Sequence, residues 1–295
     1  MLSLMKRFAA VALAVSLAAG CGVREPKIDT AAHAQEVEQW KKNRDERLRK
    51  EDSWLTLIGL HWLKEGENTV TLTKAGAPPV RLLRQGTSTI LHPDPSMTID
   101  GKPVSGDVPL LADADPNGPT IVKMGSVQFN VIKRNDRYGL RVKDAESAVR
   151  THFKGLEYYP IDPKWRVTAR FEAYHPPKKI PITDVTGMTS DNISPGALIF
   201  EVDGQEYRLD PILEEGSDQY FIIFRDATSR DTTYPAGRYL YAPQAKDGKT
   251  VVDFNKAYNP PCAFTDFATC PLPPLQNRLA VRIEAGEKKF AGGAH

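Results

Sequence analysis

The sequence has few cysteines and histidines, and it has none of the short motifs on which common catalytic sites depend. Its 295 residues include only three cysteines and six scattered histidines. It contains no Gly-x-Ser-x-Gly elbow, no phosphate-cradling glycine loop, no His-Glu-x-x-His pair and no dinucleotide-binding glycine pattern. These absences argue against the enzyme classes that carry those motifs. We expect neither a metal site nor a cofactor.

An excess of charge of one sign is also missing. The chain has 39 Lys and Arg residues against 37 Asp and Glu residues, a formal net charge of +2. Lys6 and Arg7 lie in a segment that we expect to be removed, and their loss brings the formal charge to zero. A neutral protein has no bulk attraction for nucleic acid, so we expect no nucleic-acid partner.

The N-terminus has the three parts of an export signal. Lys6 and Arg7 form the basic part, residues 8–18 the apolar part, and small residues lead to Cys21. The apolar run is too short to span a bilayer. We therefore expect residues 1–20 to be a cleaved signal peptide and residues 21–33 to be a tether.

The end of this signal, Leu-Ala-Ala-Gly-Cys at residues 17–21, resembles the bacterial lipobox, in which the cysteine becomes the lipid-modified first residue. Ala18 departs from the pattern, which prefers Leu there, and an ordinary cleaved signal with Cys21 incidental is the alternative. By resemblance to sorting rules, Gly22 points to the outer membrane. The lipobox thus implies a lipoprotein of the bacterial cell envelope, anchored at Cys21 on the periplasmic face of the outer membrane.

Export would place Cys262 and Cys270 in a compartment where disulfides persist. Eight positions separate them, and bridging so short a loop would contribute about 2 to 3 kcal/mol. Zinc ligation is a weaker alternative, because two cysteines supply half a site and no Cys-x-x-Cys or nearby His completes it. A nucleophilic thiol is weaker still, since no local His offers a base. We expect a disulfide.

Residue patterns predict a mainly β fold. Residues 34–51 are rich in helix formers, and the apolar residues 54–63 are too few to span a membrane, so they read as core. Short β-rich runs with turn signals such as Asp100-Gly101 and Asn135-Asp136 follow. We predict two packed antiparallel β-sandwich or barrel-like units preceded by one N-terminal helix.

We place the unit boundary near residue 155. The first unit, residues 34–154, would hold the helix and a sandwich loosely similar to forkhead-associated domains, although their phosphopeptide-reading pattern cannot be placed here. The second, residues 155–290, would hold a cysteine- and proline-rich loop. Within it, residues 165–174 alternate as a strand that Pro176 and Pro177 end, and residues 278–284 form a later strand.

Several specific segments resemble the bacterial family catalogued as domain of unknown function 1684. They are spread over nearly the whole chain that follows the signal. The resemblance implies a family name, with no established activity and no assigned catalytic residues to transfer. The segments are SWLTLIGLHWL (residues 53–63), FRDAT (224–228), TYPAGRYL (233–240), DFNKAYNPPCAFT (253–265), CPLPP (270–274), NRL (277–279) and AGE (285–287).

Polar residues gather in the last seventy residues, at strand ends and in the proline-rich loop. If these ends converge, they form a pocket with an aromatic floor and a few directional polar groups. Arg238 would offer a fork for a carboxylate or phosphate, and Asp253 and Glu287 could act as acid and base. The candidate ligand-binding residues are Asp226, Arg238, Tyr239, Asp253, Asn255, Tyr258, Asn259 and Glu287.

Structural roles compete with these functional ones. Asp253 and Asn255 could cap turns, Arg238 could pair with Asp226, and Asn259 could open a turn before Pro260. Three hypotheses follow: a lipid-anchored module that binds a small ligand or partner, a hydrolase-like enzyme using Asp253 or Glu287 with Arg238, and a purely structural envelope protein. We rank binding first. The expected ligand is a small molecule, and the lipid anchor would attach the protein to the membrane.

Overall fold

The computed structural model describes residues 29–292. The expected signal peptide, Cys21 and the first part of the tether lie outside the described residues. Within them, α1 (Thr30–Arg49) and α2 (Ala148–Thr151) are the α-helices, and antiparallel sheets make up most of the remaining regular structure. The predicted mainly β fold with one N-terminal helix is therefore confirmed.

Helix α1 begins where the sequence supplies a cap. The Asp29 carboxylate accepts hydrogen bonds from the backbone N–H groups of Ala31 and Ala32, at 3.1 and 3.0 Å, which satisfies donors that have no partner inside the helix. No Gly or Pro interrupts the twenty residues. The buried residues lie on one face of the helix, and they are His33, Val37, Arg44 and Leu48.

The first half of the chain forms two sheets. Their strands are β1 (Leu57–Trp62), β2 (Gly66–Val70), β3 (Val80–Gln85), β4 (Ser88–His92), β5 (Thr98–Ile99), β6 (Lys102–Pro103), β7 (Val108–Pro109), β8 (Val122–Met124), β9 (Val127–Arg134) and β10 (Arg137–Asp144). One sheet has the order β1-β10-β9-β8-β5-β6 and the other β2-β3-β4-β7. One buried cluster lies between them and includes Leu82, Leu91, Phe129 and Leu140, each worth about 1.5 to 3 kcal/mol of apolar burial.

The second half forms two more sheets around another core. The strands are β11 (Arg166–Thr183), β12 (Thr189–Val202), β13 (Gln205–Leu209), β14 (Ile212–Leu213), β15 (Gln219–Phe224), β16 (Arg238–Pro243) and β17 (Lys249–Asp253). The orders are β13-β12-β11-β17 and β14-β15-β16. Phe200, Phe224 and Phe254 pack at its centre, with ring centroids 5.4 to 5.5 Å apart in two of the pairs.

Tight turns connect several of these strands where the sequence signals them. Asp100, Asn135, Asp203 and Asp247 have φ between 50° and 53°, a region that Asn, Asp and Gly tolerate best. The Asn135 turn joins β9 to β10, and the Asp203 turn joins β12 to β13. Local chemistry therefore sets these hairpins.

One predicted strand end and one predicted strand are wrong. Pro176 and Pro177 do not end β11, because the ribbon with β12 resumes at Lys178 after a break in register. Residues 278–284 form no strand, because their backbone is bonded irregularly: the N–H of Leu279 donates to Arg225 and the N–H of Ile283 donates to the Asp226 carboxylate.

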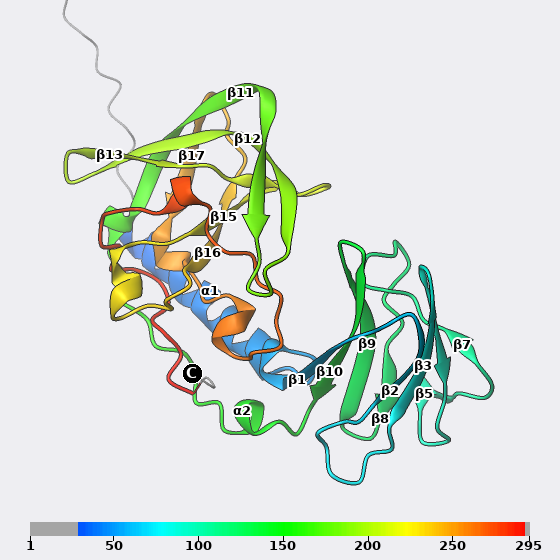
Figure 1. Ribbon diagram of the computed structural model, residues 1–295. Coiled ribbons are helices and arrows are strands. Elements are labelled where there is room, and N and C mark those ends of the chain that lie inside the picture. Colours follow the sequence, from blue (N-terminus) through cyan, green and yellow to red (C-terminus); the bar gives the residue numbers. More distant parts are fainter. Residues whose placement is uncertain (1–28, 293–295) are drawn as a thin grey trace, which may run out of the picture.

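Helix α1 lies against the C-terminal half, whereas we had grouped it with the first sandwich. Figure 1 shows the blue helix among the orange segments that follow β17, with β1 leading to the cyan and green strands. A small apolar cluster of Leu48, Leu55, Phe153 and Phe264 links the end of α1 to both halves. The boundary near residue 155 stays a prediction.

Candidate functional site

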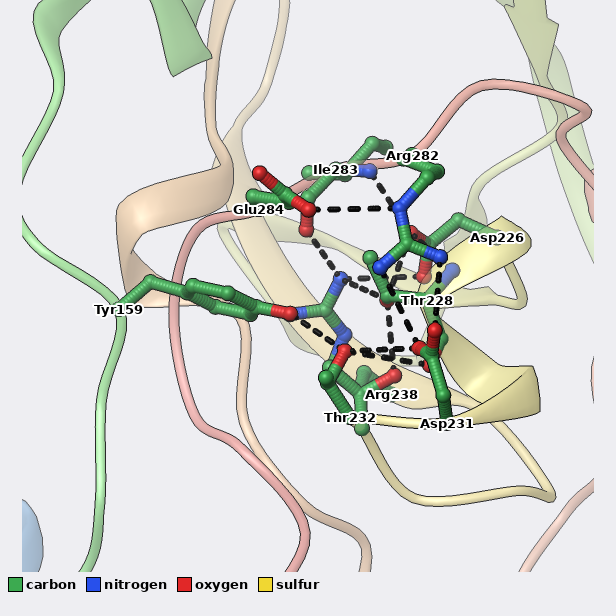
Figure 2. A network of polar contacts seen from close by, with 10 residues as sticks. Tyr159, Asp226, Thr228, Asp231, Thr232, Arg238, Arg282, Ile283 and Glu284 are labelled. Carbon is green, nitrogen blue, oxygen red and sulfur yellow. Dashed lines mark hydrogen bonds and ion pairs between the residues drawn. The ribbon is translucent and has the colours of Figure 1, made fainter.

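Arg238, the residue expected to receive a ligand, is sealed inside the protein. It begins β16, and its side chain has no exposed surface. Its Nη2 donates to Asp226 Oδ1 at 3.0 Å and to the carbonyl of Ile283 at 2.9 Å, and Nη1 donates to the carbonyl of Ala285. Figure 2 shows this network, in which the guanidinium is surrounded by the turn residues it holds.

Both carboxylate oxygens of Asp226 also accept hydrogen bonds within the protein. Its second oxygen, Oδ2, accepts hydrogen bonds from Thr228 Oγ1 and from the backbone N–H of Ile283, both at 2.8 Å. Burial lowers the pKa of Arg238, while the charge of Asp226 and the hydrogen bond to it act in the opposite direction. The pair thus fixes residues 226–233 and 283–285 to the start of β16. It has no opening to a ligand.

Glu287 forms a second buried pair, with helix α1. Its Oε1 accepts from Arg44 Nε at 2.8 Å, and its Oε2 accepts from the backbone N–H of Asn259 at 2.7 Å. The carbonyl of Asn259 accepts from Arg44 Nη2 at 3.0 Å. Burial alone would lower the pKa of Arg44, but Glu287 outweighs it and the pKa is raised. Each oxygen of this carboxylate therefore has a partner within the protein.

Asp253 forms a third buried pair. Its Oδ2 lies 2.8 Å from His33 Nε2 on α1, and its Oδ1 accepts from the backbone and side-chain amides of Asn255 at 3.2 and 2.9 Å. The Asn255 side chain also bonds both backbone groups of Asp162. These contacts favour the turn-capping interpretation of Asp253 and Asn255.

The predicted polar cluster is therefore dispersed into separate structural contacts. The hydrolase-like hypothesis needed Arg238 and a carboxylate at one cavity, and the positions of Arg238 and Glu287 do not supply this. Five of the eight candidate residues stay away from the large groove described next, and they are Asp226, Arg238, Asn255, Asn259 and Glu287. Tyr239, Tyr258 and Asp253 line it.

The groove lies between α1, strands β15 and β16, and the segment from Ala268 to Pro271. Arg134 of β9 and Arg141 of β10 also line it. Its cavity volume is about 1290 Å³. Six aromatic side chains line it, and they come from segments far apart in sequence: Trp40, Trp54, Phe221, Tyr239, Tyr241 and Tyr258.

The aromatic side chains pack against one another at the groove. Tyr241 stacks on Phe221 at 5.0 Å between ring centroids and on Tyr258 at 6.3 Å. Tyr258 also meets Tyr239 edge-on at 5.8 Å and Trp40 at 6.5 Å. Because Tyr241 remains 41% exposed, this floor presents an aromatic surface to water.

The sequence did not reveal the other walls of the groove. Trp40, Trp54, Arg134 and Arg141 all come from before residue 155, and all line the groove. In the sequence, Trp40 is distinguished only as an aromatic residue within a segment rich in charged residues. Arg141 alternates with the core residues Leu140 and Val142, a pattern that predicts an ordinary solvent-facing position.

Cys262 and Cys270 lie next to each other, and Cys270 lines the groove. Both are buried thiols in this structure, and the N–H of Cys262 lies 3.0 Å from Cys270 Sγ. The hydrogen bond to Cys270 lowers the pKa of Cys262, whereas burial raises the pKa of Cys270. The disulfide stays a prediction.

Two further findings concern the described part of the chain as a whole. Among residues 29–292, no cluster of three or more His, Cys, Asp or Glu side chains is arranged to hold a metal ion. None of the helices in that range combines the length and apolar character that crossing a bilayer requires.

Comparison with known proteins gives a family without an assigned activity. The profile of the family described as "Protein of unknown function (DUF1684)" matches residues 151–288, so the resembling segment at residues 53–63 lies outside the match. An uncharacterized protein of Haloarcula marismortui, known from a solution NMR structure, is 33% identical in sequence. The match covers 47% of this chain and 78% of that protein's chain, with a TM-score of 0.41. No curated protein matches. The chain carries a DUF1684 domain over residues 151–288.

Proposed function

We propose that the protein binds a small ligand with a flat apolar body in the groove between α1 and β16. The observation that carries this proposal is the aromatic lining, assembled from a helix, a loop and two strands around one cavity. A concave site with an apolar floor and a few polar groups is the usual build of a small-molecule site. Stacking on Tyr241 and Tyr258 would orient such a body.

Binding is favoured over catalysis because the two carboxylates that the hydrolase-like hypothesis requires, Asp253 and Glu287, are engaged in structural contacts. Asp253 is held by His33 and Asn255, and Glu287 is held by Arg44 and Asn259. A general base must reach its proton within hydrogen-bond distance, and these contacts direct both carboxylates towards groups of the protein itself. The groove supplies aromatic contact area, which favours binding.

The proposal includes the place where binding occurs. The protein would be exported, lipidated at Cys21 and held at the bacterial cell envelope, so that its groove meets ligands of the periplasm. The intact mass of the mature protein tests this part: a lipid adduct on a chain beginning at Cys21 supports it, and an unmodified chain beginning elsewhere overturns it.

The groove is tested with a neutral aromatic probe, 2-naphthamide, by isothermal titration calorimetry. We expect one site per chain, and we expect Tyr241→Ala to weaken binding by about tenfold or more, the loss of one aromatic contact. Tyr241 is partly exposed, so its loss spares the core. Leu275→Ala is the control, because Leu275 is 76% exposed and lies outside the groove.

Two results would count against the groove as a binding site. One is a wild-type protein that takes up no naphthalene probe at all. The other is a Tyr241→Ala variant that binds 2-naphthamide as tightly as wild type does, since the probe would then be held elsewhere.

A further inference from the structure

Arg141 lies on a polar face of the first six-stranded sheet. It stands on β10 opposite Leu60 of β1 and Asn130 of β9. Its neighbours Leu140 and Val142 point into the apolar core on the other face, because successive residues of a strand alternate. Arg141 therefore points away from that core, and it lines the groove.

Three arginines are buried among residues 29–292, and Arg141 differs from the other two. Arg44 and Arg238 each bond a carboxylate and backbone carbonyls. Arg141 is 8% exposed and makes no hydrogen bond or ion pair with a described residue, and its buried Nε, like that of Arg238, has no hydrogen-bond partner. A buried charge without a partner is costly to a fold, so its retention calls for an explanation.

Asp113, the carboxylate whose charge acts on Arg141, is already bound to another arginine. Asp113 Oδ2 accepts from Arg134 Nη1 at 2.8 Å, and Arg134 Nε donates to the hydroxyl oxygen of Thr269 at 3.1 Å. Arg134 and Thr269 line the same groove as Arg141. Because that hydroxyl oxygen accepts from Arg134, its own hydrogen remains available to donate.

Arg141 stays positively charged at neutral pH, and Trp54 holds the plane of its guanidinium. Burial, and then the neighbouring Arg134, lower its pKa to about 10, so the guanidinium is still charged at neutral pH. Its Cζ lies 5.2 Å from the centre of the Trp54 ring, a contact that orients a planar cation. The result is a charged fork with unused donors beside an aromatic surface.

We propose that Arg141 binds an oxyanion, a carboxylate or a phosphate, carried by the aromatic ligand of the groove, with Arg134 and the Thr269 hydroxyl completing the anion site. The inference rests on the proposed function and names the chemical class of its ligand. The planar fork of arginine matches both oxyanions with two parallel hydrogen bonds. The anion would supply the partner that the protein itself does not give to Arg141.

The test compares probes that share an apolar body and differ in the attached group. Calorimetry at neutral pH and constant ionic strength would use 2-naphthoate, 2-naphthyl phosphate and the neutral 2-naphthamide. Acetate and inorganic phosphate alone show whether the anion binds without the aromatic body. The proteins are wild type, Arg141→Met, Arg141→Lys and the control Arg137→Met, which changes an exposed arginine of the same strand that lies over Trp62.

We expect wild type to bind an anionic probe about tenfold or more tighter than 2-naphthamide. Arg141→Met should abolish that preference, and Arg141→Lys should restore only part of it, because an ammonium group keeps the charge without the fork. Arg137→Met should behave as wild type. The better of the carboxylate and phosphate probes identifies the headgroup.

The outcomes separate this inference from the proposed function. If 2-naphthamide binds as tightly as the anions, or if Arg141→Met keeps the preference, the anion site is overturned while the groove stands. If acetate or phosphate binds wild type but not Arg141→Met, and no naphthalene probe binds, the anion site stands and the aromatic groove fails. If nothing binds, both are overturned.

Discussion

Arg44 and Glu287 lie 243 positions apart in sequence, and their side chains form one buried ion pair. Arg44 Nε donates to Glu287 Oε1 over 2.8 Å, and neither side chain is more than 9% exposed. The pair fastens α1 to the end of the C-terminal half. Because α1 forms one wall of the groove, this contact joins the stability of the fold to the shape of the candidate site.

The first prediction is that Arg44→Met or Glu287→Gln destabilises the protein by about 3 to 5 kcal/mol, since each leaves a buried charge or buried polar groups without a partner. Urea unfolding followed by far-UV circular dichroism measures the change. The double variant Arg44→Met/Glu287→Gln should lose less than the sum of the two single variants, because it removes both buried charges together.

The matched control for that prediction is a pair on the exposed side of the same helix. Lys41 and Glu38 lie 3.0 Å apart, with Glu38 63% exposed, and Glu38→Ala should cost less than about 1 kcal/mol. If Arg44→Met costs no more than this control, the buried pair does not fasten the helix.

The second prediction concerns Arg238, which we assign to structure. Arg238→Met should destabilise by about 3 to 5 kcal/mol, because Asp226 would keep its buried charge. Arg238→Lys should not restore stability, since one ammonium cannot reach Asp226 and both carbonyls as the guanidinium does. Affinity for the naphthalene probes, measured where each variant is folded, should stay at the wild-type value. A large loss of affinity in folded Arg238→Lys would return this residue to the binding site.

Much of the fold is readable from local patterns, because its strands and turns are set by neighbouring residues. Alternation predicts the start of β11, and the Asp and Asn turns fall where φ is positive. The packing of α1 is different in kind. It depends on pairs such as His33 with Asp253, 220 positions apart, and no local period encodes such a partner.

The candidate site was predictable only in part for the same reason. Tyr239, Tyr258 and Asp253 were singled out because they lie near one another in sequence, and all three line the groove. The number of charged residues in a segment does not tell which arginines form ion pairs within the protein. Arg238 forms one with Asp226, whereas Arg141 forms none with a described residue. That difference depends on contacts between distant segments.

The third prediction is that Arg141→Met stabilises the ligand-free protein by about 1 to 3 kcal/mol, because it removes a buried charge that has no ion pair or hydrogen bond within the described residues. Thermal and urea unfolding measure the gain, and Arg137→Met should stay within about 0.5 kcal/mol of wild type. A variant that is more stable and fails to bind anions would mark Arg141 as a residue kept at a cost to stability. A destabilised Arg141→Met would instead assign Arg141 a structural role.

The sign of the pH dependence follows from the pKa of Arg141, which burial, and then Arg134, lower to about 10. The unfolded chain holds this proton more tightly, so the group favours unfolding fully below about pH 10 and progressively less above it. The charged or titratable groups that face it are Arg134, Lys143, Asp113 and Cys270. The stability difference between wild type and Arg141→Met should therefore be constant near neutral pH and shrink above pH 10.

The last prediction concerns Cys262 and Cys270, whose adjacent thiols can lose two electrons and two protons to an added disulfide such as oxidised glutathione. The pKa of Cys262 is lowered by the hydrogen bond to Cys270, which favours the thiolate that starts the exchange. A bridge over this short loop should stabilise the protein by about 2 to 3 kcal/mol. Intact mass under denaturing conditions detects the bridge, and urea unfolding with and without reductant measures its effect. Cys262→Ala/Cys270→Ala should unfold at the same urea concentration in both conditions. A protein that stays a dithiol in excess oxidant, or that forms the bridge without gaining stability, would contradict the prediction.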